Sequence, residues 1–495
     1  MSFGQPFDWL RQPPAPMAGV RGVRPATGPQ AWQVRAAAGF AVPRDALRLA
    51  LFLLTLVSIG RIHQQFPTLA LLRPALILVI ATGVYALLNP RLVSTANLKR
   101  TWPPRLVAGL GILACCSALF GISLGASATF ILDTYSKVLV FAFLVMAATR
   151  SARDLWFFVW AYVASTGVLV WMALFVFKLS IEPGDATERL GRLHMYDGND
   201  AAVVLLIGLP LTLLAFQVSK AKGKVFSALI FVGIGAALAR TGSRSGFLGA
   251  VAVGLMLLFG VHSISFTRRL VFAVLAAVPL ILTAPSGYWE RISTIAHPTE
   301  DYNWEQMDGR IQVWQRGMGY MVDYPLFGIG INNFSRAEGT ISEKARNAPR
   351  GRGIRWTAPH NSFVEAGAEL GVPGLILFSS LVFGGIWAMV RLQRRLPRSW
   401  ASGTLEERFL YLGSGYFATS MVGFAVAASF VSHAYLDHFY YLVALMTGLY
   451  GCIYDRQARF AVPSTAPPVP AGSGLPMLGF PAPSSPVSWP RRDAT

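Results

Sequence analysis

Twelve long runs of apolar residues constrain the fold of this 495-residue chain more than any other feature. An α-helix needs about 20 mostly apolar residues to cross the hydrocarbon core of a bilayer. Because the runs are continuous, they do not fit a membrane β-barrel, whose strands alternate apolar and polar residues. The sequence therefore predicts an all-α polytopic membrane protein with about 12 transmembrane helices. The predicted spans are residues 45–61, 69–88, 105–123, 128–148, 154–177, 200–218, 225–239, 244–262, 269–284, 373–391, 409–431 and 437–454.

The composition supports this class and excludes several soluble ones. Hydrophobic residues make up 54% of the chain and charged residues 14%, whereas a soluble domain carries about 25% charged residues. A large cytosolic enzyme and a fully disordered chain are therefore excluded. The three cysteines are too few for a disulfide framework in a chain of this length.

The charge balance is strongly basic, with 43 Lys and Arg against 24 Asp and Glu, or a net charge of +19. Basic loops that fix membrane topology and contacts with anionic lipid headgroups both account for such an excess. The sequence holds no basic module interleaved with aromatic residues. We therefore expect the lipid bilayer, and not a nucleic acid, as a partner.

Basic residues lie at every second connection between the predicted spans, and this alternation sets the orientation. If the basic side is cytoplasmic, both termini face the cytoplasm and the other connections face the periplasm of a Gram-negative bacterium. We therefore expect a multi-pass protein of the bacterial inner membrane. The connecting basic residues are Arg91, Lys99, Arg100, Arg150, Arg153, Lys220, Lys222, Lys224, Arg268, Arg269, Arg391, Arg394, Arg395 and Arg398.

The chain divides into five segments. Residues 1–44 and the Pro-rich residues 456–495 are expected to be disordered cytoplasmic tails. Residues 45–284 hold spans 1–9, and residues 373–455 hold spans 10–12. Between them, residues 285–372 form a large, partly helical periplasmic loop. Long structured loops tend to carry function, so we expect the site there.

Arginines on the outer side need an explanation, because topology keeps most basic residues inside. Arg240 and Arg244 flank a Gly-containing turn at a spacing of four residues, and Arg73 lies in the outer half of the second span. The guanidiniums of Arg240 and Arg244 could converge on one anion, since Arg binds phosphate through two hydrogen bonds. Alternatively, they anchor helix ends at the membrane surface.

Residues 304–324 of the outer loop have the pattern of an amphipathic helix. Ile311, Trp314 and Met318 recur at helical spacing, and Arg310 lies one turn before Trp314. This arrangement would place the Arg310 guanidinium at the depth of lipid phosphates. The alternative is an ordinary interfacial arginine.

A histidine stands before another predicted helix of the loop. Ser362 and Glu365 have the spacing of a capping box, so a short helix should begin just after Ser362 and end near Gly371. His360 then lies at the positive end of this helix, which favours its neutral, basic form. A neutral imidazole can accept a proton from a sugar hydroxyl. A loop histidine with a structural role is the alternative.

Other charged groups carry weaker signals. Asp133 and Lys137 are four residues apart inside the fourth span and could neutralise each other. His433, Asp437 and His438 crowd the last outer turn, but a metal site needs three or four ligands and no second cluster supplies them. We therefore expect no metal and no other cofactor.

Six motifs follow one another over about residues 195–450. They are Asp197-Gly198-Asn199-Asp200, Thr241-Gly242-Ser243-Arg244, the Arg310 and Trp314 helix, Pro325-Leu326-Phe327-Gly328-Ile329-Gly330, Pro359-His360-Asn361-Ser362-Phe363 and Glu369-Leu370-Gly371-Val372-Pro373-Gly374. Each motif is weak alone, but their order, spacing and outer placement make the set specific. The set resembles the motifs of the O-antigen ligase/polymerase family of bacterial membrane glycosyltransferases.

The resemblance implies a helical enzyme similar to the GT-C glycosyltransferases that acts on the periplasmic face without a metal. Its donor would be an undecaprenyl-diphosphate-linked glycan. By this resemblance Arg244 and Arg310 bind the diphosphate, and His360 deprotonates the acceptor hydroxyl. The candidate substrate-binding residues are Arg240, Arg73, Asn361 and Trp314.

The acceptor stays open between two activities of the family. A polymerase transfers the glycan to another lipid-linked repeat unit of an O-antigen or exopolysaccharide, and we favour this reading. An O-antigen ligase transfers it to the lipid A-core. A chain-length regulator and a flippase of the same pathway are conceivable further partners. A membrane transporter or flippase is the alternative from another functional class, although transporters place their sites near the bilayer midplane.

Overall fold

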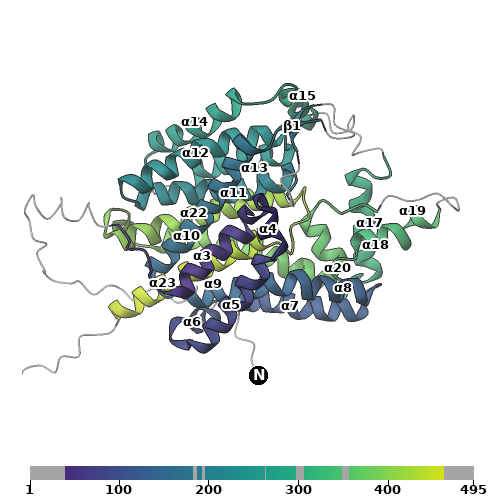
Figure 1. Ribbon diagram of the computed structural model, residues 1–495, viewed down its shortest axis with the longest axis horizontal. Helices are drawn as coiled ribbons and strands as arrows, with labels where there is room; N and C mark the ends of the chain where they lie inside the picture. Colours follow the sequence, from purple (N-terminus) through teal and green to yellow (C-terminus); the bar gives the residue numbers. More distant parts are fainter. Residues whose placement is uncertain are drawn as a thin grey trace, which may run out of the picture.

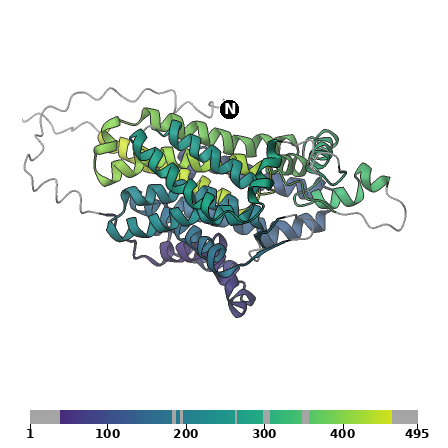
Figure 2. The same cartoon turned by 90° about the horizontal axis from the view of Figure 1, so that it is seen from above.

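The structure is a computed structural model that describes residues 39–181, 187–191, 196–261, 264–296, 306–347 and 356–461. Its helices form an elongated bundle, from one end of which the segment of α18 and α19 projects (Figures 1 and 2). Strands β1 (Leu179–Ser180) and β2 (Arg189–Leu190) pair as a short antiparallel hairpin. The α-helices are α3 (Ala46–Ser58), α4 (Pro67–Leu71), α5 (Pro74–Leu88), α6 (Ala96–Arg100), α7 (Pro103–Phe120), α8 (Leu124–Phe130), α9 (Ser136–Ala148), α10 (Ala152–Trp171), α11 (Gly198–Val218), α12 (Ala221–Thr241), α13 (Arg244–Leu255), α14 (Phe266–Leu282), α15 (Tyr288–Ser293), α17 (Arg310–Asp323), α18 (Phe334–Thr340), α19 (Glu343–Arg346), α20 (Ser362–Ser379), α21 (Gly385–Arg395), α22 (Leu405–Ala428) and α23 (Asp437–Ala461).

Each of the twelve predicted apolar runs coincides with a helical segment. Among the described residues, seven helical segments are long and apolar enough to cross a membrane, and the shorter apolar helices Ala46–Ser58, Pro74–Leu88 and Arg244–Gly260 match three further runs. The all-α polytopic membrane class is therefore confirmed, while the count of twelve spans stays a prediction. The seven segments are Pro103–Phe120, Leu124–Ala148, Ala152–Val176, Gly198–Val218, Ala221–Thr241, Ser362–Arg395 and Leu405–Ala428.

Helical turns with π geometry lengthen or join several of these helices. They continue α10 and α13 at Met172–Val176 and Met256–Gly260. They also connect α8 to α9 at Ile131–Tyr135 and α20 to α21 at Ser380–Gly384. The joined segments Leu124–Ala148 and Ser362–Arg395 are long enough to cross a bilayer, whereas Arg244–Gly260 remains shorter.

Two predicted boundaries differ from the structure. The second span, predicted as continuous over 69–88, breaks into α4 and α5 at Arg73. Pro74 explains the break, because proline lacks an N–H donor and disfavours helical geometry at the preceding residue. At the other end of the chain, α23 runs to Ala461, six residues into the segment predicted as a tail. Residues 1–38 and 462–495 of the predicted tails lie outside the described residues.

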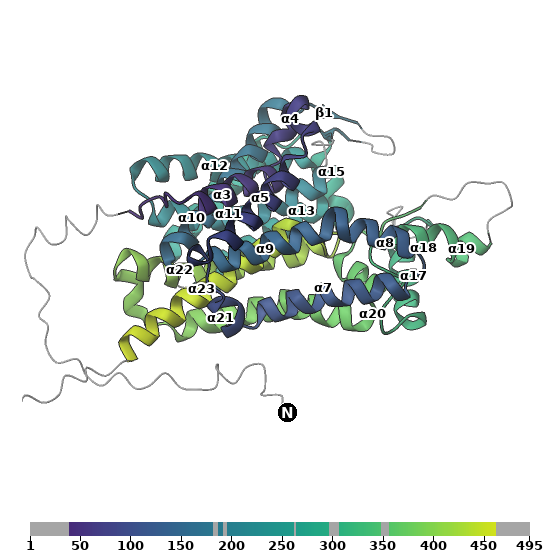
Figure 3. The same cartoon turned by 60° about the horizontal axis from the view of Figure 1, so that its bottom comes forward.

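Helix α11 is the centre of the bundle. It is buried along nearly its whole length and packs against α10, α12, α13 and α22 (Figure 1). A helix that is apolar on all sides is typical of such a core position. In Figure 3, α7 runs beside α20 at the edge of the bundle. Helix α11 is enclosed by its four neighbouring helices.

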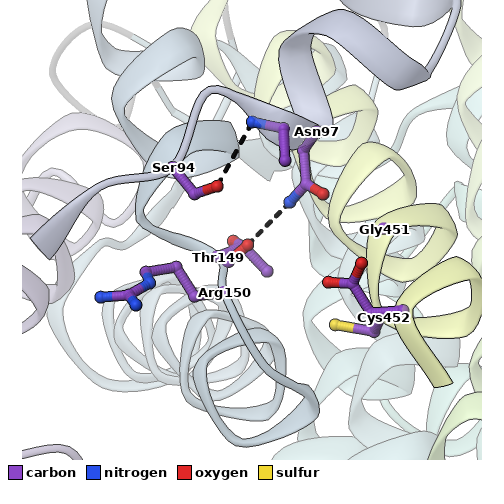
Figure 4. Close-up of a pocket in the computed structure, with 8 residues that line it drawn as sticks. Ser94, Asn97, Thr149, Arg150, Gly451 and Cys452 are labelled. Carbon is purple, nitrogen blue, oxygen red and sulfur yellow. Dashed lines mark hydrogen bonds between the residues drawn. The ribbon is translucent and has the colours of Figure 1, made fainter. Parts of the chain in front are cut away.

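A small polar pocket of about 190 Å³ lies where the loop before α6 meets α23 (Figure 4). Asn97 donates a hydrogen bond to the carbonyl oxygen of Thr149 at 2.7 Å, and its amide lies against Gly451. A side chain at position 451 would collide with this amide. The pocket also contains Arg150 and lies among the basic connections that the sequence assigns to the cytoplasmic side.

Candidate functional site

Helix α17 carries Arg310 at its first position and Trp314 one turn later, as the sequence predicts. The Trp314 indole N–H donates a 2.8 Å hydrogen bond to the carbonyl oxygen of Pro359, and its ring lies 6.2 Å from that of Phe430. Residues at i and i+4 share a helix face. The start of α17 is therefore tied to the residue directly before His360.

The buried face of α17 differs from the predicted one. Val313, Gly317 and Tyr320 are buried against α20 and the following loop, whereas Met318 of the predicted apolar stripe is half exposed. The helix packs on protein along this face, so its buried stripe is rotated by about one residue from the stripe that the sequence suggests. The helix of the structure, Arg310–Asp323, covers the carboxyl-terminal two thirds of the predicted range 304–324.

The buried carboxylate of Glu338 holds α17 in place, although no sequence motif points to this residue. Glu338 is fully buried and accepts hydrogen bonds from Arg316 Nε at 2.9 Å and from the Tyr320 hydroxyl at 2.9 Å. It also accepts one from the Thr357 hydroxyl at 3.1 Å. Burial and the neighbouring carboxylate raise the pKa of Tyr320 above its usual value, so this hydroxyl stays a donor. Glu338 thus joins α17, α18 and the chain leading to His360.

The loop between α17 and α18 folds through two glycines. Gly328 and Gly330 have φ values of 68° and 101°, which a residue with a side chain rarely adopts. The loop is held by Glu369 of α20, whose carboxylate accepts the backbone N–H groups of Asn332 and Phe334 at 2.7 and 3.0 Å. This motif has an architectural role, since it seats the loop on α20.

His360 is exposed and has a left-handed backbone, with φ 46°. Its backbone N–H donates to the Ser432 hydroxyl at 3.0 Å. A left-handed conformation costs a residue other than glycine about 1–3 kcal/mol and persists only where its surroundings enforce it. The hydrogen bonds of the Pro359 carbonyl and the His360 N–H fix the peptide group that precedes this residue.

The helix after His360 is capped differently from the prediction. Asn361, and not Ser362, is the N-cap of α20, and its side-chain oxygen accepts the N–H groups of Phe363 and Val364. Ser362 instead donates to the Val431 carbonyl at 2.7 Å and accepts the His433 N–H at 2.9 Å. The expected capping box is wrong because tertiary contacts with the turn before α23 engage Ser362. Gly371, with φ 74°, interrupts the helix where the sequence predicts its end.

The turn of Arg244 connects α12 to α13. Ser243 caps α13 and donates through its hydroxyl to the Asn199 side-chain oxygen at 2.8 Å. Arg244 is half-buried and donates to the Thr294 hydroxyl at 2.8 Å, whereas Arg240 donates to the Phe177 carbonyl at 3.1 Å. The two guanidiniums therefore bind different elements. Arg244 binds the turn after α15, and Arg240 binds the end of the segment that continues α10.

The turns of Arg244 and His360 meet at the start of α11. Asn199 holds the Arg244 turn, and its neighbour Asp200 lies 2.8 Å from the His433 Nε2 atom. Ser432, beside His433, holds the His360 backbone. The two turns and the helix of Arg310 are therefore connected by hydrogen bonds between residues that are neighbours along the chain.

Arg73, the remaining predicted site residue, has no described hydrogen bond to this region. Arg73 is exposed at the break between α4 and α5, whose main packing partners are α3, α9 and the adjoining turns. None of the hydrogen bonds described for the chain ties Arg73 to the other candidates. In the described part of the chain, no group of three or more His, Cys, Asp and Glu residues is placed to hold a metal ion.

Comparison with known protein families finds a match to part of this chain. Residues 226–379 match the sequence model of a family described as O-antigen ligase. The matched range includes Arg240, Arg244, Arg310, Trp314 and His360, and Arg73 precedes it. No curated protein matches the chain.

The hydrogen bond between Trp314 and Pro359 gives a direct test of the site's geometry. In Trp314→Phe the ring remains but the donor is lost, which removes roughly 1 kcal/mol of local stabilisation. We expect amide hydrogen exchange of residues 356–361 to rise about fivefold in hydrogen–deuterium exchange mass spectrometry, as that free energy implies. Trp171→Phe, at an exposed position of α10, is the control and should leave this exchange unchanged. Equal exchange in both variants would contradict the described contact.

Proposed function

Since this chain belongs to the O-antigen ligase/polymerase family by the match of residues 226–379, we propose that it is a membrane glycosyltransferase. It transfers a glycan from an undecaprenyl-diphosphate carrier to a hydroxyl of an acceptor sugar. The reaction takes place on the periplasmic face of the bacterial inner membrane, with both termini in the cytoplasm. A fold similar to that of the GT-C glycosyltransferases is part of this proposal.

The observation that carries the proposal is the convergence of three separate segments. The turn of Arg244, the start of α17 with Arg310 and the turn of His360 are linked by hydrogen bonds through Asn199, Trp314 and Ser432. A donor with a diphosphate leaving group and an acceptor hydroxyl requires cations and a base in one place. This region supplies both kinds of group.

The proposed chemistry is a direct displacement at the anomeric carbon. A ring nitrogen of His360 takes the proton of the acceptor hydroxyl, and the hydroxyl oxygen attacks the anomeric carbon. The bond between that carbon and the diphosphate oxygen breaks, and its electron pair leaves with the lipid diphosphate. Arg244 and Arg310 stabilise the charge that develops on the leaving group, so the proposal needs no metal. The new glycosidic bond has inverted configuration.

The base His360 can be tested by removal of its side chain. His360→Ala should lower glycan transfer by the purified protein on the order of 10²–10⁴-fold, the usual contribution of a general base. The assay uses a lipid-diphosphate-linked glycan and no ion gradient, which also separates an enzyme from a transporter. His63→Ala, in the turn after α3, is the control and should retain activity. Full activity of His360→Ala would exclude this base.

Arg310 can be tested by a change that keeps its charge. A lysine ammonium cannot form the two parallel hydrogen bonds of a guanidinium with a phosphate. We therefore expect Arg310→Lys to lose most transfer activity, measured with the same donor. Arg336→Lys, at an exposed position of α18, is the control and should retain activity. An active Arg310→Lys enzyme would contradict the role of Arg310 in diphosphate binding.

Of the two candidate acceptors, we propose a lipid-linked repeat unit, which would make the protein a polysaccharide polymerase. The O-antigen ligase is the second candidate, because the matching family carries that description. Deletion of the gene followed by analysis of lipopolysaccharide and secreted polysaccharide separates them. For a polymerase we expect lipid A-core capped with a single repeat unit. Long lipid-linked chains together with bare core would instead identify a ligase.

A further inference from the structure

Two buried histidines and a carboxylate form a chain beside the proposed site. His433 Nε2 lies 2.8 Å from the Asp200 Oδ1 atom, and His433 Nδ1 lies 3.0 Å from His438 Nε2. His433 and His438 are 2% and 0% exposed, whereas the Asp200 side chain is 27% exposed. The chain therefore runs from the interior of the bundle toward an accessible carboxylate.

The hydrogen-bonding capacity of an ionised Asp200 sets the direction of the first bond in this chain. An ionised carboxylate only accepts, so His433 donates from Nε2 and its Nδ1 is an acceptor when the ring is neutral. His438 then donates from Nε2 to that acceptor. In this arrangement both donors point toward Asp200. A chain of donors that ends on one oxygen stabilises the charged carboxylate.

The second Asp200 oxygen is also held. Asp200 Oδ2 accepts the backbone N–H of Asp197 at 3.1 Å, in the capping box that begins α11. The amino-terminal end of a helix favours a negative charge. Asp200 is thus an immobilised anion, fixed by the helix start on one side and by His433 on the other.

His360 and this anion are held by adjacent residues of one turn. A protonated His360 imidazole interacts attractively with the Asp200 carboxylate. The backbone of Ser432 and His433 links them, because Ser432 holds the His360 N–H and His433 holds Asp200. One turn between α22 and α23 therefore sets the position of both groups.

We propose that Asp200 is a positioning residue for His360, an inference that rests on the proposed function. When His360 takes the proton of the acceptor hydroxyl, its ring becomes an imidazolium, and the fixed negative charge of Asp200 stabilises it. The His433–His438 pair keeps Asp200 in place and charged. Tyr196 and Glu365 are further titratable groups that interact with Asp200.

The test removes the charge of Asp200 while keeping its shape. In Asp200→Asn the protonated form of His360 loses its stabilisation, so the base is weaker and kcat should fall at least tenfold. The acid limb of the pH profile should move to lower pH by about one unit or more, the usual effect of losing a nearby opposite charge. The KM for the lipid-linked donor should stay unchanged, since Asp200 does not bind it.

The matched control is Asp197→Asn, which removes a negative charge three residues away. Asparagine is as good an N-cap as aspartate, so α11 keeps its cap. We expect the activity and the pH profile of this control to match those of the wild-type enzyme. A change of the same size in both variants would overturn the proposal, because general charge at the start of α11 would then explain the effect.

A second pair of variants tests His433 directly, and it keeps the proposal testable if Asp200→Asn does not fold. A glutamine N–H at position 433 can still donate to Asp200, whereas a leucine cannot. We expect His433→Gln to retain most activity and His433→Leu to resemble Asp200→Asn, with elution as a single peak and melting temperature as checks of folding. Equal activity of the two folded variants would overturn the proposal.

The outcomes separate this inference from the proposed function. If His360→Ala is inactive while Asp200→Asn and His433→Leu have wild-type rates and pH profiles, the positioning role is excluded and the enzyme assignment stands. If the wild-type protein transfers no glycan, the proposed function itself fails.

Discussion

The arrangement of the site depends on the contact between the start of α20 and the turn that precedes α23. Ser362 joins the two through both its donor and its acceptor, Glu365 accepts the Ala434 N–H at 3.0 Å, and Ser432 accepts the His360 N–H. Buried backbone groups need partners, and here side chains at the start of α20 provide them for a turn about 70 residues away. The imidazole therefore has a fixed place relative to the helices of the bundle.

Two buried carboxylates, Glu338 and Glu369, hold the segment from α17 to α20 in place. Glu338 collects hydrogen bonds from α17 and from the chain before His360, while Glu369 holds the loop between α17 and α18. A buried carboxylate without such partners would cost several kcal/mol. These groups give a long connection the rigidity that a binding site requires, although it contains little apolar core of its own.

Much of the fold could be predicted from the sequence, since hydrophobic length reports directly on membrane spans. The break at Arg73 was also readable in Pro74, but the apolar run on both sides masked it. Local patterns failed where tertiary contacts compete, as at Ser362, whose hydroxyl binds a distant turn while Asn361 caps the helix. The pairing of Asp200 with His433 spans 233 residues, and no local spacing in one sequence reveals such a contact.

The kink at Gly371 has a mechanical consequence. On one side of it, nine residues of α20 lead back to the turn of His360, and on the other side the same segment continues toward α21 as an apolar helix suited to the bilayer. Nine residues correspond to about 14 Å of helix. With the segment after Gly371 placed in a bilayer, its depth would set the distance of the His360 turn from the hydrocarbon.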